Sequence, residues 1–260
     1  MRHLMDWWRS RGIARERTRF DSADWSWAWK RLPLLDRLDK DTSERLADLA
    51  MRFLRDKTLE PAQGLVVTDR MRLTIAFQAA LPILELGLDW YRGWYSVILY
   101  PDVFMPEHQF INEDGLVQTE RESRSGESWS HGPVILSWAD IKAGGKLDGY
   151  NVVLHELAHK LDARSGATNG CPPLHADMSA ADWKEAFISA FDDLCQRVSR
   201  NEDTAIDPYA SESPAEFFAV ATEAFFEIPD TLATPYPEVY RQLRAFYRQD
   251  PLRASVEARP

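Results

Sequence analysis

The chain has 260 residues, of which 45% are hydrophobic and 12% are aromatic, so it can bury the sizeable core of one large domain. Its net charge is −10 at pH 7, whereas a surface that binds phosphate groups carries the opposite sign, so nucleic acid is not expected as a direct partner. No apolar run approaches the roughly 20 residues that cross a membrane, so no membrane-spanning segment is expected.

The compartment follows from the N-terminus and the cysteines. The basic N-terminal stretch of residues 1–12 is not followed by an apolar segment, so no signal peptide is predicted. Cys171 and Cys195 are not spaced as C-x-x-C, and free thiols in a reducing compartment are favoured over a disulfide. We therefore expect a cytoplasmic protein.

The first third of the chain is predicted to be helical and structural. Trp25, Trp27 and Trp29 alternate with other residues; such a cluster can form a binding platform but more often packs in a core or between helices. Apolar residues at helical spacing predict one helix after Asp41 and a second after Thr68 or Asp69. We expect residues 1–90 to be a helical region packed on a core formed by residues 91–260, together one compact unit.

Residues 94–138 have the pattern of β-strands. Aromatic and β-branched residues predict strands over 94–101 and 132–138, and a hairpin over 104–119 that turns at Asp114-Gly115. Together these segments predict a small mixed sheet of about four strands. His108 and His131 lie in this region and are expected to make ordinary structural hydrogen bonds.

One stretch, residues 149–162, carries the candidate chemistry. It contains His155-Glu156-x-x-His159, and residues four apart lie on the same face of a helix, so both imidazoles can bind one zinc ion. Glu156 is then placed to act on a metal-bound water as a general base. The residues around the motif are apolar and indicate a buried helix, where these polar groups would be costly unless a metal satisfied them.

Asp162 follows His159 by three residues. It is predicted either to hydrogen-bond a ligand imidazole or to be a solvated or capping carboxylate. His175 lies in a Gly- and Pro-containing loop over 164–178 and is a poor candidate for a ligand, and a helix is expected over 179–200.

A catalytic zinc site needs a third protein ligand. Ser213-Pro214 predicts the start of an apolar helix over 214–227. Glu216 and Glu223 are seven residues apart and fall on nearly the same face of that helix, so both are candidate ligands by spacing alone.

Two segments carry a family resemblance. His155-Glu156-x-x-His159 and Tyr209-Ala-x-x-x-Pro214-Ala-Glu216-Phe-Phe-Ala resemble the Mlc titration factor A family of bacterial cytoplasmic zinc metallopeptidases, also described as glucose-regulated. The spacing of Tyr209 and Glu216 also resembles the catalytic domain of anthrax lethal factor, a gluzincin. The resemblance to the first family covers most of the chain, with no departure in the two segments.

The resemblance implies a role for each matching residue. His155, His159 and Glu216 would be the ligands of one zinc ion, Glu156 the catalytic carboxylate and Tyr209 the donor that supports the oxyanion. Glu223 would then support the site from outside the ligand set. The implied fold is α+β and mostly helical, with the small mixed sheet over a zincin-type helix pair that carries the HExxH motif and the downstream Glu.

The expected function is hydrolysis of peptide bonds, and the resemblance suggests an aminopeptidase acting on short substrates. It also implies binding of the glucose repressor Mlc, in which the C-terminal region of the family has been implicated, and hence regulation of sugar-uptake genes. The alternative is a non-catalytic protein that sequesters a transcription repressor, with zinc serving structure. Glu156 argues against that alternative, because structural zinc does not need a general base.

Overall fold

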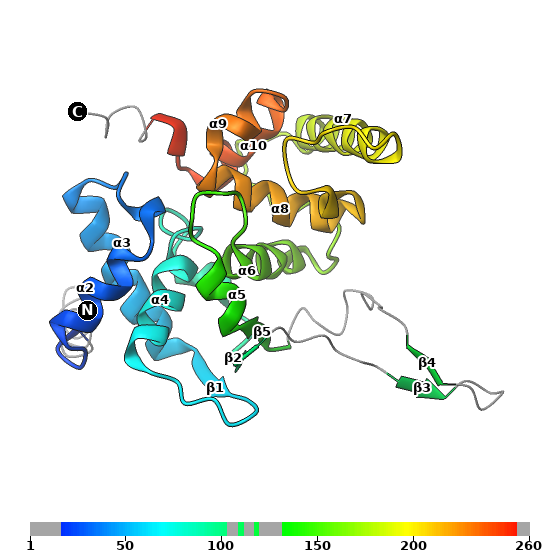
Figure 1. The fold of residues 1–260 in the computed structure, drawn as a ribbon. Coiled ribbons are helices and arrows are strands. Elements are labelled where there is room, and N and C mark those ends of the chain that lie inside the picture. The colour runs from blue at the N-terminus through cyan, green and yellow to red at the C-terminus, as the bar shows by residue number, and fades with distance from the viewer. Residues whose placement is uncertain (1–16, 103–108, 112–116, 120–131, 254–260) are drawn as a thin grey trace.

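The computed structural model describes residues 17–102, 109–111, 117–119 and 132–253. Helices make up most of the described chain (Figure 1). The helices are α2 Ser22–Lys30, α3 Lys40–Asp56, α4 Asp69–Ala80, α5 Trp138–Ala143, α6 Val152–Asp162, α7 Ala180–Ser199, α8 Pro214–Glu227, α9 Pro229–Ala233 and α10 Pro237–Tyr247, with short 3₁₀ turns η1 Pro33–Leu35, η2 Leu88–Tyr91, η3 Ala163–Ser165 and η4 Pro208–Ser211. The strands are β1 Thr58–Pro61, β2 Ser96–Tyr100, β3 Gln109–Ile111, β4 Val117–Thr119 and β5 Val134–Ser137.

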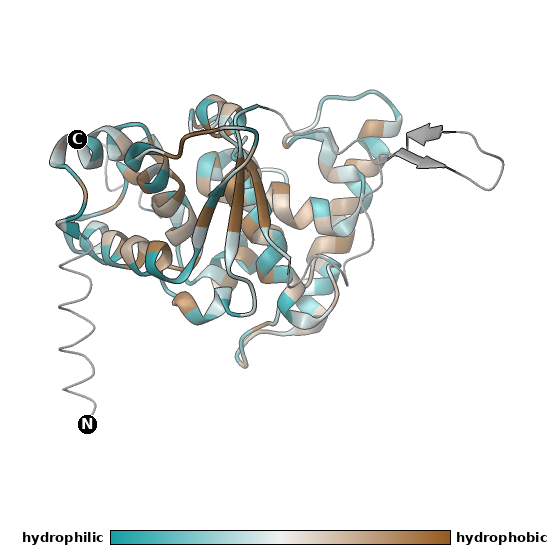
Figure 2. Cartoon of the chain, turned by 90° about the horizontal axis from the view of Figure 1, so that it is seen from below, coloured by the Kyte–Doolittle hydropathy of each residue, from teal (hydrophilic) through white to brown (hydrophobic). Residues whose placement is uncertain are grey.

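The central sheet has three strands in the order β1-β2-β5, and all of them are parallel. Leu59, Val97 and Val134 are paired across it in register and are buried, since side chains paired in register point to the same face of the sheet. These strands are largely brown in Figure 2, the colour of hydrophobic residues. The sheet therefore presents one apolar face to the core.

The α+β class is confirmed. The expectation of one mixed sheet was wrong, because the described strands form a parallel three-stranded sheet and a separate antiparallel pair. Parallel neighbours need crossover connections, and α4 supplies the one between β1 and β2. Strand β1 was not predicted, because it is four residues long, three of them exposed, and it ends in Pro61. A proline is tolerated there because β1 is an edge strand.

The predicted hairpin is present as a separate pair of strands. β3 and β4 are antiparallel, with Phe110 opposite Gln118, and they do not join the central sheet. The expected turn at Asp114-Gly115 lies outside the described residues, as do His108 and His131.

The tryptophan cluster packs between helices. Trp25 and Trp29 lie on α2, and their ring centroids are 5.0 and 5.2 Å from Phe77 of α4, edge to face. Trp27 lies beside Arg31 and Arg70, with ring centroid to guanidinium carbon distances of 5.6 and 5.2 Å. These contacts favour the helix-packing interpretation over a binding platform.

One hydrophobic core joins the N-terminal helices, the sheet and the C-terminal helices. Its fully buried large side chains include Phe53, Phe77, Trp94, Trp183, Phe218 and Phe246. Helices α6 and α8 lie side by side within it (Figure 1). In the part of the chain described here, no helix combines the length and apolar character needed to cross a membrane.

Candidate metal centre

Helix α6 presents both histidines of the motif on one face. Asn151 caps its N-terminus, with Oδ1 accepting the Leu154 amide at 3.1 Å. The opposite face is apolar and buried, including Leu154 and Leu157, so packing fixes the rotation of the helix. The side chains of His155 and His159 are left 16% and 21% exposed, which is enough for a ligand to reach them.

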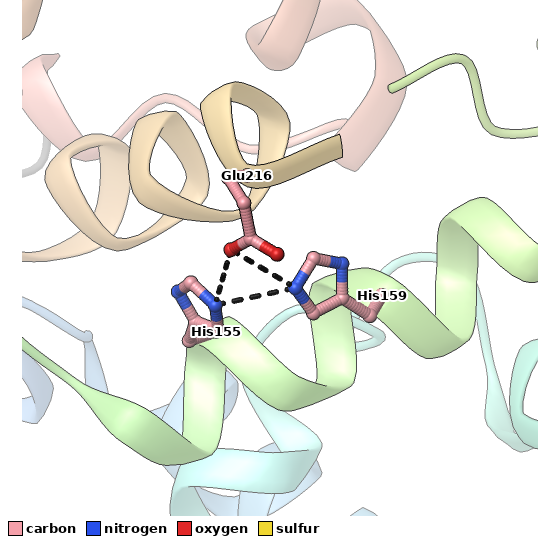
Figure 3. A group of neighbouring side chains, drawn as sticks. All are labelled: His155, His159 and Glu216. Atoms are coloured by element: carbon pink, nitrogen blue, oxygen red, sulfur yellow. Dashed lines mark hydrogen bonds and ion pairs between the residues drawn. The ribbon is translucent and has the colours of Figure 1, made fainter. Parts of the chain in front are cut away.

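Helix α8 brings Glu216 to these two imidazoles (Figure 3). The helix begins as predicted, with Pro214 in its first turn and Ser213 Oγ accepting the Glu216 amide at 3.2 Å. The Glu216 carboxylate Oε2 lies 3.0 Å from His155 Nε2 and 3.4 Å from His159 Nε2. The two Nε2 atoms are 3.2 Å apart.

These three atoms have the character of a cation site. They lie within 4.8 Å of one another, and two imidazoles with one carboxylate form a donor set that suits zinc and other transition metals. Glu216 Oε2 is buried, and the two imidazole nitrogens lie beside it at 3.0 and 3.4 Å. A buried carboxylate needs a cationic or hydrogen-bonding partner, which a metal ion shared with these nitrogens would supply.

The charges of the site act on each other strongly. Burial alone would lower the pKa of His155, but hydrogen bonds that its ring donates to the Glu216 and Glu223 carboxylates outweigh it and raise the pKa to about 10. Burial alone would raise the pKa of Glu216, but His155 and His159 lower it to about 2. The two carboxylates therefore favour a positive charge at His155, which a proton or a metal ion can supply.

Glu223 lies on the other side of His155 from Glu216. Its Oε1 is 2.8 Å from His155 Nδ1, and its Oε2 accepts the backbone amide of Asn151. Spacing left Glu216 and Glu223 open as ligands, and the structure brings only Glu216 into the group with both Nε2 atoms. A carboxylate at Nδ1 fixes the tautomer and the orientation of the imidazole.

Tyr209 lies beside His155 and is partly exposed. Asp207 caps the short turn η4 by accepting the Tyr209 amide at 2.9 Å, and the Tyr209 ring centroid is 6.2 Å from that of His155. Its side chain is 52% exposed. Partial burial, followed by the charges of Glu216 and Glu156, raises its pKa to about 12, so the hydroxyl is a hydrogen-bond donor at neutral pH.

Glu156 is half-buried and follows His155 directly on α6. Its charge contributes to the raised pKa values of Tyr209 and Tyr150, so the carboxylate is in the electrostatic neighbourhood of both tyrosines. Sequence analysis did not single out Tyr150, which is 42% exposed. Burial, then the charges of Asp140, Glu223, Asp207 and Glu156, raises the pKa of Tyr150 to about 12.

Asp162 is fully buried and is not the solvated carboxylate that one interpretation predicted. Its Oδ2 accepts the Gly170 amide at 2.7 Å, and burial raises its pKa to about 6. His175, the loop histidine, bonds the Phe246 carbonyl at 2.8 Å, as expected for a structural residue. Asp162 therefore ties the end of α6 to the loop that follows it.

Gly170 connects that loop to the helix that carries Glu216. Its φ is +79°, and a Cβ there would lie 2.4 Å from the Pro214 carbonyl oxygen. We expect Gly170→Ala to lower the free energy of unfolding by about 3 kcal/mol or more, because positive φ and a backbone clash add together. Denaturant unfolding measures this loss.

Gly166→Ala is the matched control, because Gly166 also has a positive φ, +93°, but has nothing within 4 Å of the added Cβ. It should cost only the backbone strain, about 1–2 kcal/mol. Equal losses in the two variants would contradict close packing of Gly170 on Pro214.

Comparison with known proteins agrees with this geometry. Residues 4–248 match the family model described as glucose-regulated metallo-peptidase M90. The chain belongs to this family. It is 39% identical over 224 residues to the protein named Mlc titration factor A of Yersinia enterocolitica, an alignment that covers 85% of this chain and 84% of that protein. The proteins of the same name from Yersinia pestis and Yersinia pseudotuberculosis are also 39% identical over 85% of this chain and 83% of their own length. Membership of the family makes a metallopeptidase the leading functional class.

Proposed function

We propose that the protein is a zinc metallopeptidase in which His155, His159 and Glu216 hold one zinc ion. The observation that carries this proposal is the convergence of two Nε2 atoms and the buried Glu216 carboxylate within 4.8 Å of one another. Two His and one Glu make three protein ligands, the number found in catalytic zinc sites, which leave a position open. When bound, zinc supplies Lewis acidity, which acidifies water and polarises a carbonyl.

Glu156 is the proton carrier of the proposed reaction. Its carboxylate takes a proton from the attacking water and later delivers that proton to the leaving amine, as a general base and then a general acid. Its place directly after His155 on α6, and the action of its charge on Tyr209, support this role. Glu223 holds the Nδ1 side of His155 and leaves Nε2 directed toward Glu216.

Tyr209 is the proposed oxyanion donor. Its hydroxyl keeps its proton at neutral pH because its pKa is raised to about 12, and a donor aimed at developing negative charge stabilises the transition state. The exposed side chain of Tyr209 is accessible to substrate.

The charge around the site supports action at peptide N-termini. Asp140 and Asp207 lie close enough to Tyr150 for their charges, together with those of Glu223 and Glu156, to raise its pKa. A group of acidic side chains attracts a cationic group, and the amino terminus of a short peptide is such a group. This supports the aminopeptidase activity that the family resemblance implies.

Strand β5 offers a place for the substrate backbone. It lies at an edge of the three-stranded sheet. Lys160 of α6 donates a hydrogen bond to the carbonyl of Gly132, just before β5, at 2.8 Å, which ties the start of the strand to the motif helix. An extended peptide can add to such an edge through main-chain hydrogen bonds. A complex with a substrate analogue that makes no main-chain bond to residues 133–137 would contradict this part of the proposal.

Removal and return of zinc test the proposed function. Chelated protein should lose peptide hydrolysis and regain it at one equivalent of zinc. Since the pKa of His155 is raised to about 10 in the metal-free protein, zinc must displace a proton, and its affinity should fall about 100-fold between about pH 8 and about pH 6. Isothermal titration at both pH values measures this change. Full hydrolysis by the chelated protein would contradict a metallopeptidase.

A second function is favoured by the relatives' name, Mlc titration factor A. We propose that this chain also binds an Mlc-type glucose repressor in the cytoplasm and so affects sugar-uptake genes. Co-purification of the Glu156→Gln variant with such a repressor would separate binding from catalysis, because that substitution leaves the rest of the surface intact.

A further inference from the structure

Asn151 joins two buried acidic residues of α8 to the start of the motif helix. Its backbone amide donates to Glu223 Oε2, and its side-chain Nδ2 donates to Glu227 Oε1 at 2.9 Å. Its Oδ1 accepts the Leu154 amide as the cap of α6. Asn151, Glu223 and Glu227 are only 1%, 3% and 2% exposed, so solvent does not compete for these bonds.

Glu227 is anchored on its other side as well. Its Oε2 accepts the Leu147 amide at 2.8 Å, and Leu147 is one of the non-glycine residues with positive φ, +57°. Both oxygens of Glu227 are therefore used to hold residues 147 and 151. The segment before α6 is fixed to α8 through one carboxylate.

Capping alone does not account for this arrangement. A serine would cap α6 equally well, and Glu223 and Glu227 place two acidic side chains one turn apart in the core, where burial raises the pKa of both. Buried acidic groups are costly, and apolar side chains of similar size would often be more stable. The free-energy cost of burying Glu223 and Glu227 is consistent with a role of these residues in the metal centre.

The hydrogen bonds of Asn151 lead through Glu223 to His155, one of the proposed metal ligands. The Asn151 amide occupies one oxygen of Glu223, and the other oxygen is 2.8 Å from His155 Nδ1. The plane of the Glu223 carboxylate is thereby set from both sides, and with it the orientation of the His155 ring whose Nε2 faces Glu216.

We propose that Asn151 and Glu227 are positioning residues for the metal centre: their hydrogen bond places Glu223, and Glu223 orients His155 for metal binding. This inference rests on the proposed function, because it assumes that His155 binds a metal. It gives the segment before α6 a role in metal binding, although that segment belongs neither to the HExxH motif nor to the three proposed ligands.

The test compares Asn151→Ser with the wild-type protein. Serine keeps a cap acceptor for Leu154 and the backbone amide for Glu223, but it loses the donor to Glu227. We expect zinc affinity, measured by competition with a chromophoric chelator, to fall about 10-fold, the lower end of the range for outer partners of metal ligands. The visible spectrum of the cobalt-substituted variant should shift as well, because it reports the ligand geometry.

Glu227→Gln is the second variant and keeps the side-chain shape. Its amide group can accept only one of the two hydrogen bonds from Asn151 and Leu147, so it should weaken zinc binding by a similar factor. The double variant should be no weaker than either single variant, because both substitutions act on the same path of hydrogen bonds that leads to Glu223.

Ser179→Ala is the matched control, since Ser179 Oγ caps α7 by accepting the Asp182 amide at 3.2 Å. It removes a helix cap away from the site and should leave zinc affinity and the cobalt spectrum unchanged. Unchanged affinity and spectrum in Asn151→Ser and Glu227→Gln, with wild-type protein that binds zinc, would overturn the positioning role and leave the metallopeptidase proposal standing. Wild-type protein that binds no zinc would overturn both.

Discussion

Glu156→Gln is expected to abolish peptide hydrolysis while the protein keeps its zinc. The substitution removes the carboxylate that accepts the proton of the attacking water, and general acid–base groups contribute about 10²–10⁴-fold to a rate. His155, His159 and Glu216 are untouched, so zinc content should remain at one ion per chain. Hydrolysis of a short peptide and metal analysis of the same preparation give the two values.

Glu185→Gln is the matched control for this variant. Glu185 lies exposed on α7, so the same chemical change there should leave both hydrolysis and zinc content at the wild-type level. Full activity of Glu156→Gln would contradict the proposed mechanism. Loss of zinc together with activity would instead mean that Glu156 supports the metal.

Glu216→Ala is expected to lose the metal itself. Removing one of three protein ligands should weaken zinc binding by more than about 100-fold, beyond the range found for groups that only orient a ligand. Peptide hydrolysis should disappear at zinc concentrations that saturate the wild-type protein. Competition with a chelator and hydrolysis assays at rising zinc concentration measure both effects.

Glu223→Ala gives the comparison that decides between the two acidic residues. Glu223 contacts His155 Nδ1 at 2.8 Å, whereas Glu216 lies 3.0 Å from His155 Nε2 and 3.4 Å from His159 Nε2. The Glu223 variant should therefore lose about 10–100-fold in zinc affinity, less than the Glu216 variant. The reverse order would make Glu223 the ligand.

Local sequence signals predicted the helices of the site well. The helix expected over 214–227 is α8, Pro214–Glu227, because Ser213 and Pro214 specify a helix start within a few residues. The motif helix was expected from about residue 149 and begins at Val152. The cap residue Asn151 marks the true start of this helix, whereas the apolar pattern alone does not.

The sheet was predicted less well because its pairing is not local. Parallel strands are joined across long connections, and the sequence within each strand does not state which neighbour it has. A proline indicates a break in regular structure, yet Pro61 ends an edge strand and pairs with Leu99 of β2. The register could be learned only from the packed structure.

The same limit applies to the site. Glu216 and Glu223 share one face of α8, and the way α8 lies against α6 decides which one meets Nε2 and which meets Nδ1. Asn151 and Glu227 were not predicted, because they are 76 positions apart in the chain. Glu227 is the third acidic residue on the apolar helix α8 and follows Glu223 by four residues. That unusual placement was the one signal in the sequence that pointed to it.

Anomalous diffraction at the zinc absorption edge, from crystals of the purified protein, tests directly whether these three residues hold zinc. We expect a single strong peak between His155 Nε2, His159 Nε2 and the Glu216 carboxylate, at about 2.0–2.2 Å from each ligand atom. No peak at these residues, or a peak bound by other side chains, would contradict it.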